Sequence, residues 1–140
     1  MYNNLLLVAD NLNHALPAAR MVGETARRMG SADLCIAVAY APVADCLGSP
    51  YTEQATARRQ AKAEALAQRL LREVGSIPGK VQTELLAGTM AEVTRTIAQT
   101  HGSDLIVMGS EEPGPLRRLW ARRHDREVVD LALCPVLIVG

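Results

Sequence analysis

The residues with the clearest capacity for chemistry lie in the last third of the chain, directly after an apolar run. Gly109 and Ser110 follow the segment DLIVM, and a helical pattern resumes further on. A glycine turn between a strand and a helix is a place where main-chain N–H groups often bind phosphate. The same loop carries cationic side chains that can bind phosphate through their guanidinium groups instead. These cations are Arg117, Arg118, Arg122 and Arg123.

The loop also contains residues that oppose a main-chain phosphate site. Pro113 and Pro115 have no N–H to donate. Glu111 and Glu112 place two carboxylates where phosphates would arrive. At ~4 Å and an effective dielectric constant of ~20, one such like-charge contact costs roughly 4 kcal/mol. The pattern favours a solvated loop in which glutamates pair with arginines, and the alternative is a guanidinium site for phosphate.

Other reactive side chains show no catalytic or metal-binding arrangement. The three histidines lie in separate elements without ligand spacing, so no metal site is predicted. Ser110 lacks a Gly-x-Ser-x-Gly elbow, and no general base is indicated for it or for a cysteine, so nucleophilic catalysis is not predicted. The three cysteines are widely spaced and include no CxxC pair, which favours reduced thiols, with the loop residue Cys46 as the candidate for redox reactivity. These residues are His14, His101 and His124, and Cys35, Cys46 and Cys134.

The composition limits the class of protein. A chain of 140 residues fits one domain, 1–140, and a hydrophobic content of 49% supports a buried core. Fifteen basic and fifteen acidic residues give a net charge of zero, which disfavours nucleic-acid binding by phosphate neutralisation. The apolar runs are too short to cross a membrane, and the N-terminus does not resemble a signal peptide, so we expect a cytoplasmic protein without a membrane partner.

Short apolar runs alternate with helical patterns along the chain. This alternation predicts an α/β fold in which a parallel sheet carries helices on both faces. Ligands of such sheets bind at the carboxyl ends of the strands, where Asp10, Ala39 and Gly109 lie. The predicted strands are Asn4–Asp10, Asp33–Pro42, Val81–Gly88, Asp104–Gly109 and Cys134–Gly140, with the third less uniformly apolar, as an edge strand would be. The predicted helices are His14–Arg28, with Pro17 in its first turn, Thr52–Val74, one from the capping box of Thr89 and Glu92 to His101, and Arg126–Leu133.

Four segments together resemble the universal stress protein family. They are LLLVAD near the N-terminus, GTMAE after the third strand, SDLIVMGS around the fourth, and CPVLIV at the end. The similarity spans the chain. It implies a Rossmann-like fold of the adenine nucleotide alpha-hydrolase type, with five parallel strands in the order 3-2-1-4-5, and a homodimer. One branch of the family binds ATP and another does not.

The ATP-binding branch carries Gly-x-x-Gly, nine residues, and then Gly-Ser or Gly-Thr. On this chain the first glycine is Gly109, while the other positions fall on Glu112, Arg122 and Arg123. Gly114 lies two residues out of register and would replace the second glycine only in a remodelled loop. The resemblance therefore implies a degenerate ATP motif, and we predict no cofactor, with ATP as the alternative.

The resemblance also assigns candidate nucleotide contacts outside the loop. Asp10 occupies the family's aspartate position, and Ala39 and Met108 match positions that line the adenine slot, with Ser110 beside the first phosphate glycine. The alternatives are that Asp10 braces the next loop and that Ala39 and Met108 are core residues. Trp120 is interpreted either as a partner contact or as a lid over the vacated slot, and the lid is favoured.

The sequence of the last predicted strand indicates that this strand forms a dimer interface. An apolar edge strand exposes N–H and C=O groups that a second copy can satisfy. The residues concerned are Val136, Leu137, Ile138 and Val139. The combined prediction is a non-catalytic, dimeric stress-response or regulatory module without strong ATP binding, which also contacts an unknown protein partner. The alternatives are an adenine-nucleotide binder that uses the arginine-rich loop and a weak ATPase.

Overall fold

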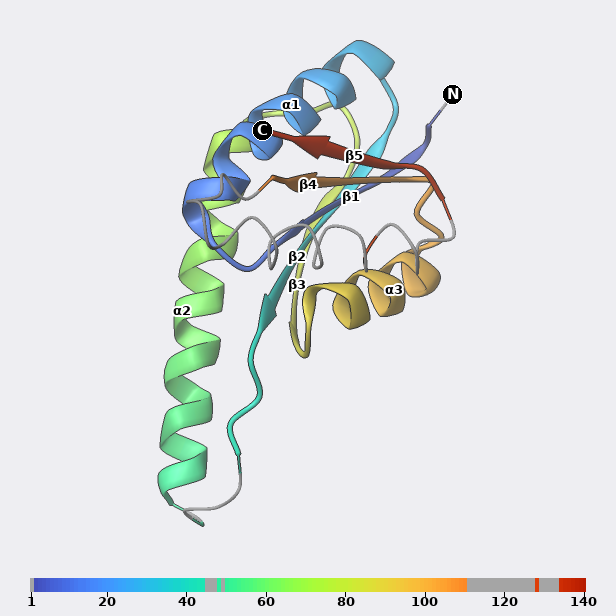
Figure 1. Cartoon of the computed structure of the whole chain (residues 1–140). Coiled ribbons are helices and arrows are strands. Elements are labelled where there is room, and N and C mark those ends of the chain that lie inside the picture. The colour runs from blue at the N-terminus through green and yellow to red at the C-terminus, as the bar shows by residue number, and fades with distance from the viewer. Residues whose placement is uncertain (1, 45–47, 49, 111–127, 129–133) are drawn as a thin grey trace.

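The structure is a computed structural model that describes residues 2–44, 48, 50–110, 128 and 134–140. Its strands form one parallel sheet with the order β3-β2-β1-β4-β5, which confirms the predicted topology (Figure 1). The less apolar third strand lies at one edge, as predicted, and β5 lies at the other. The strands are β1 (Asn4–Ala9), β2 (Asp33–Tyr40), β3 (Val81–Ala87), β4 (Leu105–Gly109) and β5 (Val136–Val139). The helices are α1 (Leu12–Met29), α2 (Tyr51–Val74) and α3 (Met90–His101).

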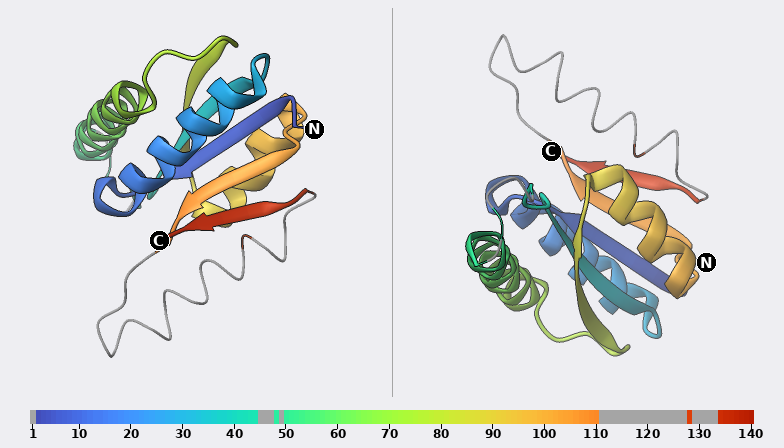
Figure 2. Two further views of the ribbon diagram at one scale, coloured as in Figure 1. Left: turned by 90° about the horizontal axis from the view of Figure 1, so that it is seen from above. Right: turned by 90° about the horizontal axis from the view of Figure 1, so that it is seen from below.

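The helices cover both faces of the sheet. α1 and α2 pack on one face and α3 on the other, as the two views of Figure 2 show. Consecutive residues of β1 point to opposite faces, so Leu5 and Leu7 contact the α1–α2 layer while Leu6 and Val8 contact the α3 layer. The chain has no Phe, and Leu, Val, Ile and Ala fill the core. The central strands are therefore buried on both sides, which explains their continuous apolar sequences.

α1 begins two residues earlier than the sequence predicts. The side chain of Asn11 accepts a hydrogen bond from the Asn13 N–H at 2.9 Å and caps the helix at Leu12. Pro17 therefore lies in the second turn, not in the first turn as predicted, and the carbonyl of Asn13 lacks its usual helical donor. The C-terminal end agrees with the prediction, because Gly30 adopts a left-handed φ of 80° directly after the helix.

The capping box predicted before α3 is present. The Thr89 hydroxyl accepts a hydrogen bond from the Glu92 N–H at 3.2 Å, and the Glu92 carboxylate accepts one from the Thr89 N–H at 3.3 Å. The predicted helix over 126–133 lies outside the described residues except for Val128, which is buried. The rest of the predicted element boundaries agree with the structure to within one or two residues.

Candidate ligand-binding clefts

The carboxyl ends of β1, β2 and β4 meet at one edge of the sheet, where the sequence places its candidate site. Ala9 pairs with Val38 of β2, and Val8 pairs with Met108 of β4. Asp10 and Ala39 therefore come from neighbouring strand ends although they are far apart in the sequence. The parallel register thus brings together the candidate residues of three strands.

Two clefts open at this edge. The larger cleft, of about 680 Å³, lies between the strand ends and the helices α1 and α2; the smaller cleft, of about 360 Å³, lies beside the start of α3. Asp10, Ala39, Tyr40 and Ala41 line both clefts. The larger cleft is also lined by Asn11, Leu12, Asn13, Val38, Arg59, Lys62, Ala63, Ala65, Leu66 and Arg69. The smaller cleft is also lined by Pro42, Gly88, Thr89, Met90 and Glu92.

Gly109 is required by the packing of β4 against α1. A Cβ at this position would lie 1.8 Å from the carbonyl oxygen of His14 and 2.4 Å from its carbonyl carbon. Both are main-chain atoms, so rotation of a side chain cannot relieve the contact. The close approach explains the glycine without any ligand.

The main chain after Gly109 already has a hydrogen-bond partner. The Ser110 N–H donates to the Val139 carbonyl oxygen at 2.7 Å. Ser110 also lies against the chain end, where a Cβ on Gly140 would lie 3.4 Å from the Ser110 Cβ. The first amide of the predicted phosphate turn therefore belongs to the β4–β5 ladder.

The remaining predicted contacts differ in their accessibility. Met108 is only 2% exposed, packs with Ala91 and Val128, and lines neither cleft. Ala39 is 4% exposed but lines both clefts, whereas Asp10 is exposed. The other candidates, Gly114, Arg122, Arg123 and Trp120, lie outside the described residues, as do Arg117, Arg118, Cys46 and the two loop glutamates.

The larger cleft has a cationic side that the sequence analysis did not assign to a site. Arg59, Lys62 and Arg69 line it from α2. The sequence predicts a helix over Thr52–Val74, and charged side chains on such a helix are typical of its solvated face. Their spacing of three and seven residues places them along one face, and this spacing was the available signal. Only the packing of α2 beside β2 and α1 turns that face into the side of a cleft.

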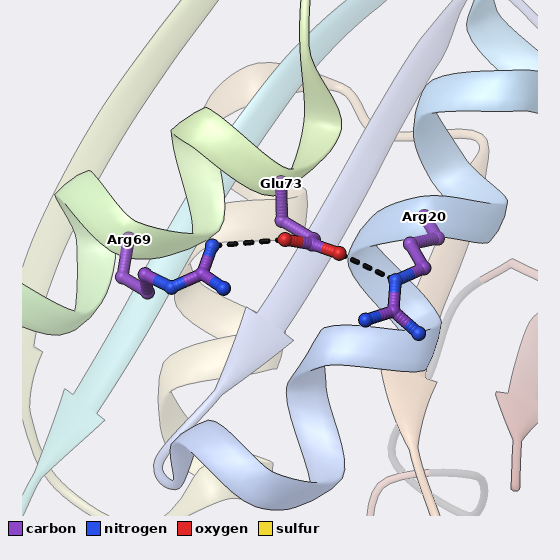
Figure 3. Close-up of polar contacts among 3 residues, drawn as sticks. All are labelled: Arg20, Arg69 and Glu73. Atoms are coloured by element: carbon purple, nitrogen blue, oxygen red, sulfur yellow. Dashed lines mark hydrogen bonds and ion pairs between the residues drawn. The ribbon is translucent and has the colours of Figure 1, made fainter.

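A shared carboxylate orients Arg69. The Glu73 side chain accepts a hydrogen bond from Arg69 Nη1 at 2.8 Å and a second, short one from Arg20 Nε of α1 (Figure 3). The hydrogen bond from Arg20, followed by that from Arg69, lowers the pKa of Glu73. The two arginines thus share one negative charge, and α1 is linked to α2 near the larger cleft.

Of the two described cysteines, Cys35 is buried and Cys134 is half-buried. Burial, with a smaller contribution from the Glu84 carboxylate, raises the pKa of Cys35 to about 12. Burial followed by the Asp104 carboxylate also raises the pKa of Cys134. Neither thiol has the thiolate character that reactivity requires.

Metal-binding clusters and membrane-spanning helices are both absent from the part of the chain that the structure describes. There, no group of three or more His, Cys, Asp or Glu side chains is placed to hold a metal ion. None of the helices within the described ranges has the length and apolarity needed to cross a membrane.

The architecture defines the class of protein. A parallel sheet of order 3-2-1-4-5, with helices on both faces and clefts at the carboxyl ends of its strands, is a Rossmann-like α/β domain. A profile of the universal stress protein family matches residues 1–140. The chain belongs to this family.

Individual relatives support this assignment. A "universal stress protein in QAH/OAS sulfhydrylase 3'region" of Thermus aquaticus is 36% identical over 139 residues, which cover 99% of each chain. The structure of universal stress protein UspA from Lactobacillus plantarum has a TM-score of 0.83 at 22% identity, covering 99% of this chain and 98% of that one. A universal stress family protein of Arabidopsis thaliana, solved with AMP bound, has a TM-score of 0.69 at 15% identity, covering 98% and 90%. The two solved structures share the fold of this chain.

Proposed function

We propose that this protein is a non-catalytic, homodimeric regulatory module of the cytoplasmic stress response that does not bind ATP strongly. The main support is the structure around Gly109. The glycine is explained by its contact with His14, and the Ser110 N–H is bonded to Val139. A main-chain phosphate site needs free N–H groups at such a turn, and the following loop contributes Pro113 and Pro115, which have none.

The side chains of the clefts support the absence of catalysis. Asp10 is the carboxylate of the larger cleft, and Glu92 of the smaller cleft is engaged in the capping box of α3. No described residue that lines either cleft is a His or a Cys. Histidine is the side chain used most often as a general base, and cysteine is a strong nucleophile, so the described clefts lack two of the side chains that most often perform these steps.

The second candidate function is adenine-nucleotide binding. The observation that favours it is the AMP-bound Arabidopsis relative, which has the same fold. In this proposal the nucleotide occupies the strand ends at Asp10 and Ala39, and Arg122 and Arg123 replace the missing glycine cradle by binding phosphate with their side chains. A weak ATPase would further require a residue that activates water.

A thermal-shift titration with Mg-ATP and with AMP tests these proposals. A site with a Kd of ~10 μM would add about 2.7 kcal/mol of stability at ~1 mM ligand. We expect no such shift with ATP, and a shift of this size would overturn the main proposal. The variant Arg122→Gln/Arg123→Gln should abolish a shift if the second candidate is correct. Release of phosphate above background would establish the ATPase.

The proposed dimer uses the exposed edge of β5. Leu137 and Ile138 are 40% and 39% exposed, whereas Val136 and Val139 are half-buried. β5 pairs with β4 on one side, and its place at the end of the sheet leaves the other side for a second copy (Figure 2). Pairing of two copies would cover these side chains and would provide hydrogen-bond partners for the N–H and C=O groups at the edge of β5.

Light scattering on two charge variants tests the dimer. Ile138→Lys should give a monomer, because a lysine in the centre of an apolar interface would be desolvated. Met21→Lys adds the same charge at an apolar residue of α1 that is 41% exposed, and it should remain dimeric. An unchanged mass for Ile138→Lys would exclude pairing through β5.

A further inference from the structure

The larger cleft combines an apolar floor with room for a small organic molecule. Val38 and Ala39 of β2 and Ala63 and Leu66 of α2 supply apolar surface, and Leu12 adds to it from α1. Leu12 is 37% exposed, so part of this apolar surface is accessible from solvent. A volume of about 680 Å³ lies within the range of roughly 300–1,000 Å³ that is usual for ligand sites.

The same cleft has an excess of positive charge although the chain as a whole is neutral. Arg59, Lys62 and Arg69 line it, and Asp10 is the carboxylate among its described lining residues. The start of α1 lies there too, and its first turn contains no acidic residue. The N-terminal end of the helix therefore adds to the positive potential.

Two of the three cations keep a charge that no carboxylate neutralises among the described residues. Arg59 Nη1 donates to the carbonyl oxygens of Ala41 and Pro42 at 2.7 and 3.0 Å, and both acceptors are uncharged. These bonds hold the guanidinium group beside the strand end. Lys62 has no hydrogen-bond or ion-pair partner within the described part of the chain.

The third cation, Arg69, is held in place by an ion pair with Glu73. Arg69 shares Glu73 with Arg20, so these three side chains together carry one net positive charge (Figure 3). The exposed fraction of the Arg69 side chain is 39%. The helix α2 thus presents two oriented guanidinium groups and the Lys62 ammonium group over an apolar floor.

We propose that the larger cleft binds a small organic anion, whose flat apolar body lies between α1 and α2 and whose carboxylate or phosphate ester contacts Arg59, Lys62 and Arg69. An apolar floor with a few polar groups at one side is the usual composition of a small-molecule site. Guanidinium and ammonium donors bind carboxylates and phosphates by charge-assisted hydrogen bonds. The main proposal rests on Gly109 and the loop that follows it, and this inference uses neither. The larger cleft does share Asp10 and Ala39 with the nucleotide site of the second candidate.

Matched small probes test the two requirements of this site separately. 2-Naphthoate has both an apolar body and a charge, 2-naphthamide has the body alone, and acetate has the charge alone. Titration calorimetry should show 2-naphthoate binding about tenfold more tightly than either partial probe. 2-Naphthyl phosphate distinguishes the two anion sources, since tighter binding than 2-naphthoate identifies a phosphate ester as the preferred class. Equal binding of naphthoate and naphthamide, or no binding of any naphthyl probe, would overturn the proposal.

Variants of α2 locate the bound probe. Lys62→Gln should weaken the affinity for 2-naphthoate about tenfold, because it removes an unpaired cation of the cleft. Arg58→Gln removes a charge from the neighbouring turn of the same helix, outside the cleft lining, and should leave the affinity within about twofold. Both residues are exposed, so both variants should fold. An equal loss in the two variants would show diffuse attraction and reject the site.

Amide chemical shifts give a readout that does not depend on affinity. With 2-naphthoate, the largest changes should occur at residues 11–13 and at Tyr40 and Ala41, which line the larger cleft. Changes centred on β5 instead would place the probe on the exposed sheet edge and contradict the proposal.

Discussion

Replacing Gly109 by alanine adds one methyl group where β4 contacts the first turn of α1. The new Cβ would lie 1.8 Å from the carbonyl oxygen of His14, less than any accessible van der Waals separation. The obstacle is main chain within a helix, so the strand or the helix must move. Because β4 pairs with both β1 and β5, displacement of β4 would disturb two strand ladders.

The expected loss of stability is large for a single methyl group. Overpacking a well-packed site costs typically about 1–3 kcal/mol. The rigid obstacle places Gly109→Ala at the upper end, near 3 kcal/mol. For a domain of this length that loss lowers Tm by roughly 10 °C. Urea unfolding and calorimetry of the ligand-free protein, at one fixed protein concentration, measure both quantities.

Ser110→Ala is the matched control. It removes a hydroxyl group at the adjacent, half-buried position and should change stability by about 0.5 kcal/mol or less. If ligand-free Gly109→Ala were as stable as the wild type, the packing explanation of this glycine would fail. A role of Gly109 in phosphate binding would then be the better explanation of the glycine.

Three further outcomes follow from individual contacts. Thr89→Ala removes the acceptor for the Glu92 N–H and should lower the free energy of unfolding by about 1 kcal/mol, and unchanged urea unfolding would show that this cap contributes nothing. The folded-state pKa of Glu73 is lowered from 4.5, so its stabilising contribution is present above the unfolded-state pKa and is lost as the pH falls through the folded value. Wild-type protein should therefore lose more stability than Glu73→Gln between about pH 5 and pH 3, and parallel pH profiles would contradict the cause assigned to the shift. Cys35, with a pKa of about 12, should resist iodoacetamide at about pH 8 until the protein unfolds, and its modification in the native state, mapped by mass spectrometry, would refute its burial.

Features that depend on neighbours in the chain were predictable from the sequence. The apolar runs predicted the strands, because each central strand is covered on both faces and carries apolar side chains towards both. The capping box before α3 and the glycine after α1 were likewise predictable, since each uses residues within one turn. The strand order came from the family resemblance, and the topology of the sheet confirms it.

The start of α1 shows where local rules are insufficient. Asn11 and Asn13 both have side chains suited to capping, so local rules allow a helix start at Leu12 as well as the predicted start at His14. The structure assigns the cap to Asn11 and places Pro17 in the second turn. Several local conformations satisfy the same sequence, and the packing of the whole helix selects among them.

Two features of the strand ends were decided by tertiary structure alone. The sequence presents Gly109 as a conformational signal, but its contact with His14 exists only because α1 docks against β4. The cations at Arg59, Lys62 and Arg69 form a regular stripe, yet they line a cleft only because α2 packs beside β2 and α1. Local sequence determines the period and the ends of an element through interactions over a few residues. Close approaches between elements depend on how distant parts of the chain pack together. The larger cleft at the strand ends is formed by that packing.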